Sequence, residues 1–385
     1  MRDALSGKVK QIKPSGIRKF FDIVSEMDDA ISLGVGEPDF DTPWHIREEG
    51  IYSLEKGRTF YTSNAGLSEL KIEISKYLDR RFDLKYDPLD EIMITVGGSE
   101  AIDGALRAML DAGDEVILPQ PSYVSYEPCI VLADGVPVIV ELKEENDFKL
   151  TREQLEKAVT DKTKILIMPF PNNPTGAIMT KEELQPIVDF VIEHDLFVIS
   201  DEIYSELTYS GNHVSIGAFP GMKERTIVIN GFSKSYAMTG WRLGYACGPQ
   251  VIIKQILKIH QFAIMCAPTT SQYAAIEALR HGDDDVEKMR DEYDRRRRFL
   301  LNAFDEMGIE CFEPYGAFYM FPSIKKFGMS SDEFATRLLK EEKIAVVPGT
   351  AFGDCGEGFL RISYAYSIDD LKAALERIGR FIEKL

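Results

Sequence analysis

The chain has 385 residues, a length that suits two domains or one large one. Its formal net charge of −18 argues against nucleic acid as the main partner, because binding a phosphate backbone needs a basic face. The five cysteines are scattered without a CxxC pair, which is typical of reduced thiols in a cytoplasmic protein and not of a disulfide framework or a zinc site. No stretch of about 18 apolar residues is present, so we expect no membrane partner.

The middle of the chain alternates short β-rich runs with helical patterns. The strand candidates are, in chain order, EIMIT (91–95), EVILP (115–119), VPVIVEL (136–142), TKILIMP (163–169), LFVIS (196–200), RTIVIN (225–230) and RLGYAC (242–247). Helical patterns between them cover residues 99–110, 122–132, 152–158 and 180–193. Thr180 and Glu183 form a capping-box signature at the start of the last helix. This alternation predicts a mostly parallel sheet with helices on both faces.

The C-terminal part of the sequence has a different character. Residues 283–308 read as one long charged helix, followed by shorter strands and two further helices, the last at 368–384. We therefore expect a large α/β domain over residues 45–282 and a smaller α+β domain formed by residues 1–44 and 283–385. Acidic residues surround the run Arg295–Arg298, so we expect a solvated helix face with i,i+4 ion pairs there and not a basic patch.

Glycines follow the first strand candidate at the edge where open α/β sheets bind ligands. Gly97 and Gly98 form a tight turn, and Ser99 lies where the next helix begins. Free backbone N–H groups and the helix dipole favour an anion there, most naturally a phosphate. Such glycines also occur for turn geometry alone, and the absence of a GxGxxG pattern gives little support to a dinucleotide site.

Polar residues follow two further strands of the predicted sheet. Asn173 lies in the turn NNPTG, where its amide either serves the turn or points at a ligand oxygen. Asp201 ends a strand that reads as buried, and a carboxylate there is costly unless it is paired. A surface loop or a helix cap is the alternative for this acid. Tyr204 lies on the same side as Asp201 if a helical turn starts here.

The segment GFSKSYAMTGWRLGY (231–245) contains Ser233, Lys234 and Arg242. A lysine at the carboxyl end of a strand, near an arginine, has a lowered pKa and is available as an amine nucleophile. Arg242 can meet a phosphate with two parallel hydrogen bonds. Taken alone, the Ser-Lys pair is better explained by a surface loop. Arg361 lies inside the apolar run 359–363 and needs an anion, for which a carboxylate is the best geometric match.

Together these groups match the parts of one cofactor and one substrate. A phosphate cradle, a buried acid, phenol and amide donors and an amine complement the phosphate, pyridine nitrogen, phenolic oxygen and aldehyde of pyridoxal phosphate. The carboxylate receptor Arg361 complements an amino acid.

The chain resembles the class I/II aminotransferases, which have fold type I of the pyridoxal-phosphate enzymes, over essentially its whole length. The segments that carry the resemblance are ISLGVGEPDFDTP (31–43), YTSNAGLSELK (61–71), GGSEAI, NNPTG, DEIYSEL, SKSYAMTGWRLG, YGAFYMFP (315–322), VVPGTAFG (346–353) and LRISYA. It is most similar to the prokaryotic subgroup that contains aspartate, aromatic and N-acetyl-diaminopimelate aminotransferases. The resemblance implies a mostly parallel seven-stranded central sheet flanked by helices, with a smaller α+β domain.

The resemblance also implies roles for the catalytic and substrate-binding residues. Lys234 matches the lysine that bonds to the cofactor aldehyde carbon and moves the proton, and Asp201 matches the acid that keeps the pyridine nitrogen protonated. Asn173 and Tyr204 match the donors to the phenolate oxygen of the cofactor. Arg361 matches the receptor of the substrate α-carboxylate, assisted by Asn173 and by the segment around Gly36.

Further residues match contacts to the rest of the cofactor. Tyr123 falls where the family stacks an aromatic ring on the cofactor. The phosphate site matches Gly98, Ser99, the backbone of Glu100, Ser233 and Arg242. The Glu100 side chain is expected to point away from the phosphate. Tyr61 matches a tyrosine that reaches the phosphate of the neighbouring subunit, which implies a homodimer with shared active sites.

The predicted reaction is a ping-pong transfer of an amino group from an amino acid, such as aspartate or an aromatic amino acid, to 2-oxoglutarate. N-acetyl-diaminopimelate transamination and a pyridoxal-phosphate-dependent C–S β-lyase remain alternatives. A dicarboxylic substrate needs a second cation, for which residues 103–110 offer only Arg107. Several aromatic residues suit aromatic substrates or belong to the core, and both interpretations stay open: Phe20, Phe21, Tyr123, Phe262 and Phe318.

Overall fold

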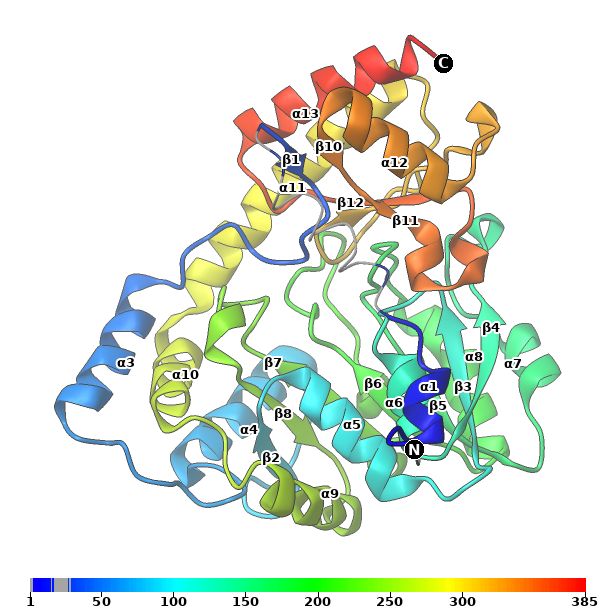
Figure 1. Ribbon diagram of the computed structural model, residues 1–385. Helices are drawn as coiled ribbons and strands as arrows, with labels where there is room; N and C mark the ends of the chain where they lie inside the picture. The colour runs from blue at the N-terminus through cyan, green and yellow to red at the C-terminus, as the bar shows by residue number, and fades with distance from the viewer. Residues whose placement is uncertain (1–2, 15, 17–26, 28) are drawn as a thin grey trace.

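The computed structural model describes residues 3–14, 16, 27 and 29–385 (Figure 1). Its helices are α1 (Gly7–Gln11), α3 (Trp44–Glu55), α4 (Ser68–Phe82), α5 (Gly98–Met109), α6 (Tyr126–Leu132), α7 (Arg152–Ala158), α8 (Lys181–Glu193), α9 (Gln250–Ala263), α10 (Thr269–His281), α11 (Asp283–Glu306), α12 (Ser331–Glu342) and α13 (Ile368–Ile382). None of these described helices combines the length and the hydropathy that a membrane span requires.

The central sheet has seven strands, in the order β2-β8-β7-β6-β5-β3-β4. Its strands are β2 (Ile92–Thr95), β3 (Glu115–Gln120), β4 (Val136–Glu141), β5 (Thr163–Met168), β6 (Phe197–Asp201), β7 (Thr226–Gly231) and β8 (Gly244–Cys247). Strand β8 runs antiparallel to both of its neighbours, whereas the pairs from β7 to β4 are parallel. The predicted mostly parallel, seven-stranded sheet is therefore confirmed.

Helices cover both faces of this sheet because consecutive strand residues are apolar and point to opposite sides. In β7, Ile227 and Ile229 pack in a core with residues of α5, α6 and α9, while Val228 packs with residues of α4 and α10. In β5, Leu166 and Met168 pack in a core with residues of α7 and α8. Because these strands are parallel, their carboxyl ends lie at one common edge of the sheet.

Helix α8 begins where its sequence predicts. The Thr180 hydroxyl accepts a hydrogen bond from the Glu183 N–H at 3.4 Å, and the Glu183 carboxylate accepts one from the Thr180 N–H at 2.8 Å. This reciprocal pair satisfies two of the backbone donors that the first helical turn leaves without partners.

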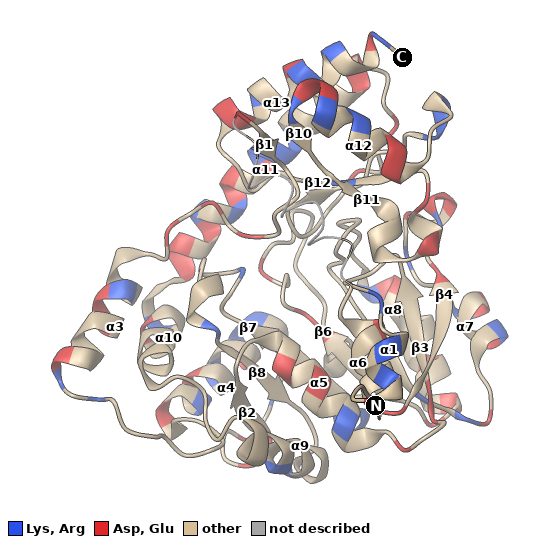
Figure 2. Cartoon of the chain, in the orientation of Figure 1, with Lys and Arg blue, Asp and Glu red and all other residues tan. Residues whose placement is uncertain are grey.

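The long charged helix α11 is confirmed, but the prediction that Arg295–Arg298 forms a solvated face is wrong for two of the four arginines. Arg296 and Arg297 are only 5% and 6% exposed. Arg296 pairs with Asp39 at 2.8 Å as well as with Glu292, and Arg297 reaches Glu313 at 2.8 Å. Figure 2 shows acidic and basic residues mixed along this helix. These arginines are buried because acids distant in the sequence cover them.

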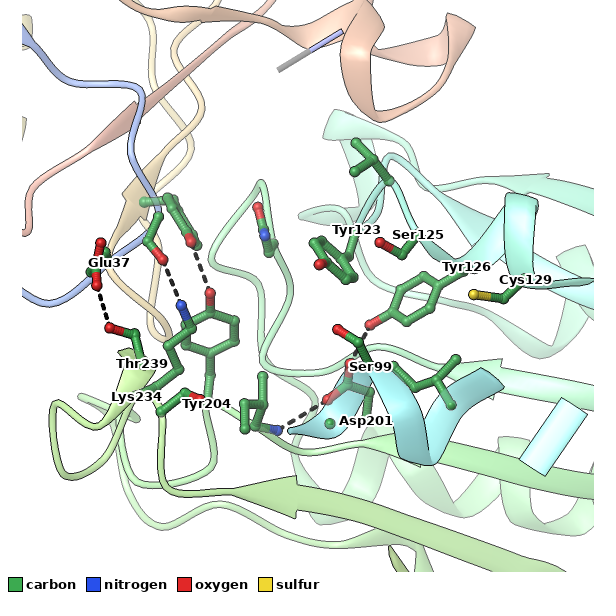
Figure 3. Close-up of a pocket in the computed structure, with 18 of the residues that line it drawn as sticks. Glu37, Ser99, Tyr123, Ser125, Tyr126, Cys129, Asp201, Tyr204, Lys234 and Thr239 are labelled. Carbon is green, nitrogen blue, oxygen red and sulfur yellow. Dashed lines mark hydrogen bonds between the residues drawn. The ribbon is translucent and has the colours of Figure 1, made fainter. Parts of the chain in front are cut away.

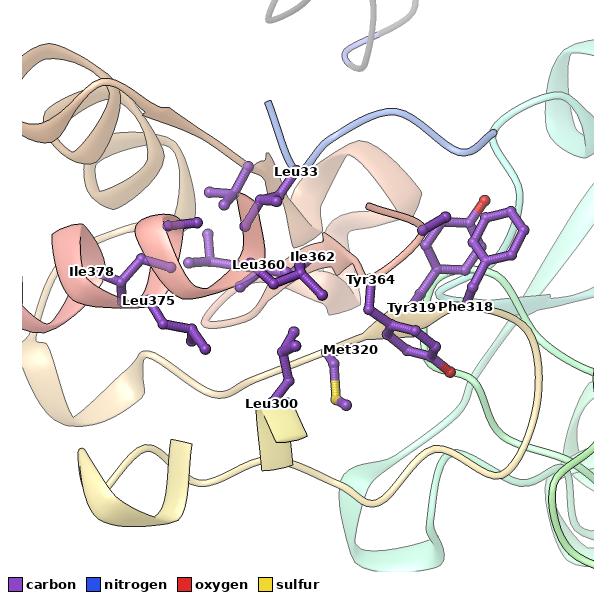
Figure 4. Close-up of a cluster of buried hydrophobic side chains, with 14 of the residues drawn as sticks. Leu33, Leu300, Phe318, Tyr319, Met320, Leu360, Ile362, Tyr364, Leu375 and Ile378 are labelled. Atoms are coloured by element: carbon purple, nitrogen blue, oxygen red, sulfur yellow. The ribbon is translucent and has the colours of Figure 1, made fainter. Parts of the chain in front are cut away.

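The C-terminal part of the chain forms a second apolar core, shown in Figure 4. Residues of α11 and α13, such as Leu300 and Leu375, pack there against Ile362 of a small antiparallel sheet. This sheet has the order β11-β12-β9. Its strands are β9 (Tyr319–Met320), β11 (Val347–Pro348) and β12 (Leu360–Ser363).

The N-terminal segment contacts both parts of the molecule. Strand β1 (Ile31–Ser32) pairs in parallel with β10 (Ile344–Ala345) next to the C-terminal core. Helix α1 instead lies beside α6, where Lys8 forms an ion pair with Asp134 at 2.5 Å (Figure 1). The division into domains at residues 44/45 and 282/283 stays a prediction.

Candidate active site

A pocket of about 960 Å³ lies at the carboxyl edge of the central sheet, where β12 also contributes to its wall. Its lining includes eleven residues that the sequence predicts for the site: Gly36, Gly98, Ser99, Tyr123, Asn173, Asp201, Tyr204, Ser233, Lys234, Arg242 and Arg361. They follow β2, β3, β5 and β7, end or follow β6, precede β8, lie between β1 and α3, or lie in β12. The parallel strand ends therefore bring together segments that are far apart in the sequence.

Lys234 lies three residues after the end of β7 and extends into the pocket (Figure 3). Its Nζ donates a hydrogen bond of 2.5 Å to the Gly36 carbonyl, and it also lies 5.8 Å from the centre of the Tyr204 ring. Burial lowers the pKa of Lys234 to about 8, and the charges of Arg361 and Arg242 act in the same direction. At pH 7 roughly a tenth of this amine is therefore neutral and nucleophilic, far more than for an ordinary lysine.

Asp201 is the last residue of β6 and is 7% exposed. Burial raises the pKa of its carboxyl group, while hydrogen bonds from the Tyr126 hydroxyl and the Ile203 N–H lower it. The Tyr126 hydroxyl donates to Oδ2 at 2.7 Å, and the Ile203 N–H donates to Oδ1 at 3.2 Å. Both oxygens keep lone pairs for a cationic group in the pocket.

Tyr204 and Asn173 present polar groups from the loops that follow β6 and β5. The Tyr204 hydroxyl lies 2.8 Å from the Tyr319 hydroxyl, and both tyrosines are buried. The Asn173 Oδ1 accepts a hydrogen bond of 3.0 Å from Arg361, which leaves its amide N–H₂ group as a donor. Tyr123 also lines the pocket, with its ring edge-to-face with Tyr126 at 5.6 Å.

Arg361 in β12 is 2% exposed and is held from several sides. Its guanidinium donates to Asn173 and to the Gly34 carbonyl and lies 4.5 Å from the Tyr319 ring centre. Within the described part of the chain, no acidic residue forms an ion pair with Arg361. Its buried Nε also has no hydrogen-bond partner of any kind there. A buried arginine in this condition is a receptor for an external anion, such as a carboxylate.

The turn before α5 lies against Arg242. Gly97 has φ +78°, and a Cβ built on it would lie 2.7 Å from the Arg242 Nη2. Arg242 itself has φ +53°, a left-handed backbone that arginine adopts rarely. The N–H groups of the α5 N-terminus, the Ser99 and Ser233 hydroxyls and this guanidinium together offer the donor set of a phosphate site.

The Glu100 side chain does not line the pocket, because its carboxylate is engaged by Val96 and His260. It accepts a hydrogen bond from the Val96 N–H at 2.5 Å, and its other oxygen lies 2.5 Å from the Nδ1 of His260. Only the backbone of Glu100 is left for an anion at the helix start.

Several other predicted residues do not line the pocket. Tyr61 is 81% exposed and is not among the residues that line the pocket. Arg107 forms an i,i+4 ion pair with Asp103 outside the pocket. Phe262 is 93% exposed and Phe318 is fully buried in the C-terminal core, while Phe20 and Phe21 lie outside the described residues.

Several pocket residues were not predicted from the sequence, among them Tyr126, Lys13, Glu37 and Thr239. Tyr126 lies only three residues after Tyr123, a spacing that could have placed both near the carboxyl end of β3. Lys13 and Glu37 come from the N-terminal segment, whose path no periodic pattern indicates. Thr239 donates its hydroxyl proton to the Glu37 carboxylate.

Comparison with known proteins agrees with this geometry. The family model of the class I and II aminotransferases matches residues 28–378. An aspartate aminotransferase of Pyrococcus abyssi is 47% identical over 99% of both chains. A Bacillus subtilis protein named probable N-acetyl-LL-diaminopimelate aminotransferase is 45% identical over 100% of this chain and 97% of its own. The crystal structure of an aromatic aminotransferase from Pyrococcus horikoshii superposes with a TM-score of 0.91 at 46% identity, covering 96% of this chain and 99% of that one.

The chain therefore belongs to the class I and II aminotransferases. It is an enzyme, a transferase of amino groups, and members of this family use pyridoxal phosphate.

Proposed function

We propose that this protein is a pyridoxal-phosphate-dependent amino-acid aminotransferase in which Lys234 is the catalytic amine. One observation carries the proposal: a half-buried lysine with a pKa lowered to about 8 shares one pocket with a buried acid, Asp201, and a buried arginine, Arg361. This combination of a nucleophilic amine, an anion and an anion receptor is what transfer of an amino group requires.

The donor set of the pocket fits the proposed cofactor. The turn at Gly97–Ser99 lies against Arg242 so closely that a Cβ on Gly97 would collide with its guanidinium, which supports a phosphate cradle. Asp201 would pair with the pyridine nitrogen, and Tyr204 and Asn173 would donate to the phenolate oxygen. Tyr123 would cover one face of the ring. When bound, the cofactor supplies an electron sink for the bond that breaks at the substrate Cα.

Lys234 has two tasks in this mechanism. Its neutral amine would hold the cofactor at the aldehyde carbon. When free, its Nζ would act as general base toward the proton on the substrate Cα and then as general acid. The lowered pKa suits both tasks because the group can be neutral or protonated near neutral pH.

Arg361 would orient the substrate. Its unpartnered Nε and its fixed guanidinium suit the α-carboxylate of an amino acid, and Asn173 adds a neighbouring polar contact. Gly36 lies beside both Lys234 and Tyr319, since a Cβ on it would lie 2.4 Å from the Tyr319 hydroxyl. The segment around Gly36 would therefore close directly over the reacting atoms.

We propose aspartate or an aromatic amino acid as amino donor and 2-oxoglutarate as acceptor. The position of Lys13 supports a dicarboxylic substrate. Lys13 lines the pocket together with Lys234, Arg242 and Arg361, and each of these three cations already has a proposed role. It replaces Arg107 as the candidate receptor of the distal carboxylate. N-acetyl-diaminopimelate remains the alternative donor, in keeping with the name of the Bacillus subtilis relative.

We also propose a homodimer with shared active sites. Tyr61 and Phe60 are each 81% exposed, and Phe262 is 93% exposed. These loops are joined, because Asn64 donates to the Met265 carbonyl at 2.7 Å and Thr269 donates to the Phe60 carbonyl at 2.8 Å. A second copy covering this aromatic surface would bring its Tyr61 to the phosphate cradle. The scattered, unpaired cysteines favour the cytoplasm.

A half-reaction screen tests the proposed function. The purified protein is loaded with pyridoxal phosphate and mixed with single amino acids in the absence of any oxo acid, and the visible absorption of the cofactor is followed. We expect aspartate, glutamate or aromatic amino acids to bleach it and to release one 2-oxo acid per site. Continuous release of pyruvate and ammonia without an acceptor would instead establish a lyase.

A further inference from the structure

Tyr126, at the first position of α6, is a pocket residue without a role in the mechanism above. It is 3% exposed, and Figure 3 shows its hydroxyl directed at Asp201. The Tyr126 hydroxyl to Asp201 Oδ2 distance of 2.7 Å is that of a strong hydrogen bond to a carboxylate. Tyr126 and Asp201 are separated by 75 residues, so only the folded sheet brings them together.

Two donors from the described residues hold the Asp201 carboxylate, one on each oxygen. The other donor is the Ile203 N–H, which is part of the loop that follows β6. Burial and the neighbouring Glu202 favour the protonated form of Asp201, and these two hydrogen bonds oppose them. Lys234 also favours the ionised form, but more weakly than either hydrogen bond. Loss of the Tyr126 hydroxyl would remove the larger of the two hydrogen-bond contributions.

The Tyr126 side chain is itself fixed. Its ring packs edge-to-face on Tyr123, with ring centres 5.6 Å apart and an interplanar angle of 82°. It belongs to the apolar core that α5, α6 and α9 form on the sheet. Burial and the adjacent Asp201 hold the pKa of Tyr126 well above its ordinary value, so the phenol keeps the proton that it donates. The donor is therefore permanent and its direction is set by packing.

We propose that Tyr126 is a positioning residue: its hydrogen bond fixes the Asp201 carboxylate in one orientation and keeps it ionised, so that this acid can pair with a protonated pyridine nitrogen. The inference rests on the proposed function, since it assigns the pyridine nitrogen of the cofactor to Asp201. Without the Tyr126 hydroxyl, the proton shared between ring and acid would move toward Asp201. The ring would then withdraw electrons less strongly.

The variant Tyr126→Phe tests this because it removes one oxygen atom and retains the ring that packs on Tyr123. We expect the affinity of the cofactor-free protein for pyridoxal phosphate to fall about tenfold or more, the equivalent of one hydrogen bond to a charged group. Fluorescence titration measures this affinity. We also expect the ¹⁵N chemical shift of ring-labelled cofactor to move toward the unprotonated nitrogen.

Tyr77→Phe is the matched control, because Tyr77 is also buried, donates its hydroxyl to the Glu206 carboxylate at 2.6 Å and does not line the pocket. A merely structural role for Tyr126 predicts that both variants lose thermal stability and that neither moves the ¹⁵N shift. Unchanged affinity and an unchanged shift in Tyr126→Phe would overturn the inference, while failure of the wild-type protein to bind pyridoxal phosphate would overturn the proposed function instead.

A double-mutant cycle separates the coupling between Tyr126 and Asp201 from a general loss of stability in Tyr126→Phe. In an Asp201→Asn background the Tyr126 hydroxyl has no carboxylate to hold, so its removal is expected to change cofactor affinity by less than about twofold, within the additivity of uncoupled sites. If Tyr126→Phe costs the same affinity with and without the Asp201 carboxylate, the two residues act independently and the inference is wrong.

Discussion

The pocket has two walls that are built in different ways. The sheet wall, formed by Ser99, Asp201, Ser233 and Lys234, stands on buried strand ends of the seven-stranded sheet. The outer wall, formed by Lys13, Gly36 and Glu37, comes from the N-terminal segment, whose described residues include α1 and β1. Core packing sets the positions of groups on the sheet wall, while the outer wall can vary without disturbing the sheet. We therefore expect residues of the sheet wall to carry out the catalytic steps and residues of the outer wall to select the substrate.

The largest effect is expected on the sheet wall, from Lys234→Ala. Loss of the amine removes the general base, and kcat is expected to fall at least about 10²- to 10⁴-fold, while pyridoxal phosphate still binds. Half-reaction rates and cofactor titration measure the two effects. Lys8→Ala is the control, since Lys8 only pairs with Asp134 on the surface. Turnover within tenfold of the wild type would remove Lys234 from its proposed role.

The second-largest effect is expected from Arg361→Gln, at a residue that belongs to neither of these two walls. Loss of a buried charged donor costs about 2–5 kcal/mol of carboxylate binding, which lowers kcat/KM for amino acids roughly 30- to 4000-fold. The comparison of an amino acid with the corresponding amine without a carboxylate isolates the contact. A variant that still prefers the amino acid as strongly as the wild type would show that another group receives the carboxylate.

The pH dependence of Lys234 is the third expectation. The pKa of its amine is lowered from 10.5 to about 8, so labelling of this lysine in the cofactor-free protein should rise with a midpoint near pH 8. The unfolded chain binds this proton more strongly than the folded one, so this lysine increases the stability of the cofactor-free protein as pH rises from about 8 to 10.5. Lys234→Met should lack this increase. A labelling midpoint near 10.5 would contradict the burial of the amine.

The smallest effect is expected on the outer wall, from Lys13→Gln. Lys13 is exposed, and exposed ion pairs contribute about 0.2–1 kcal/mol, so kcat/KM for aspartate should fall roughly 1.4- to 5-fold. Phenylalanine should react as before. Lys10→Gln is the control on the same segment, because Lys10 pairs with Asp3. Equal losses for both substrates would show that Lys13 does not select for a second carboxylate.

The sheet wall could be predicted from the sequence because strands and the residues that follow them are local patterns. Asp201 and Lys234 were found by their place after apolar runs, and the structure brings both into one pocket. The burial of Arg296 could not be found in this way. Its partner Asp39 lies 257 residues away, so the local acids alone suggested a solvated face.

Tyr126 and Lys13 were missed for related reasons. A tyrosine at the start of a helix has no feature in the sequence that distinguishes a hydrogen-bonded residue from a core residue, and only the fold places it 2.7 Å from Asp201. Lys13 follows a short helix of five residues whose course over α6 depends on tertiary contacts such as the Lys8–Asp134 pair. Neither residue could be predicted for the pocket, because its place there depends on contacts between segments that are distant in the sequence.

Borohydride reduction followed by peptide mass mapping tests the central claim most directly. The protein is loaded with pyridoxal phosphate, reduced and digested, and the modified peptide is sequenced. We predict a single cofactor adduct on the Nζ of Lys234, and its loss in Lys234→Ala. An adduct on another lysine, or none in protein that has bound the cofactor, would contradict the assignment of Lys234 as the catalytic amine.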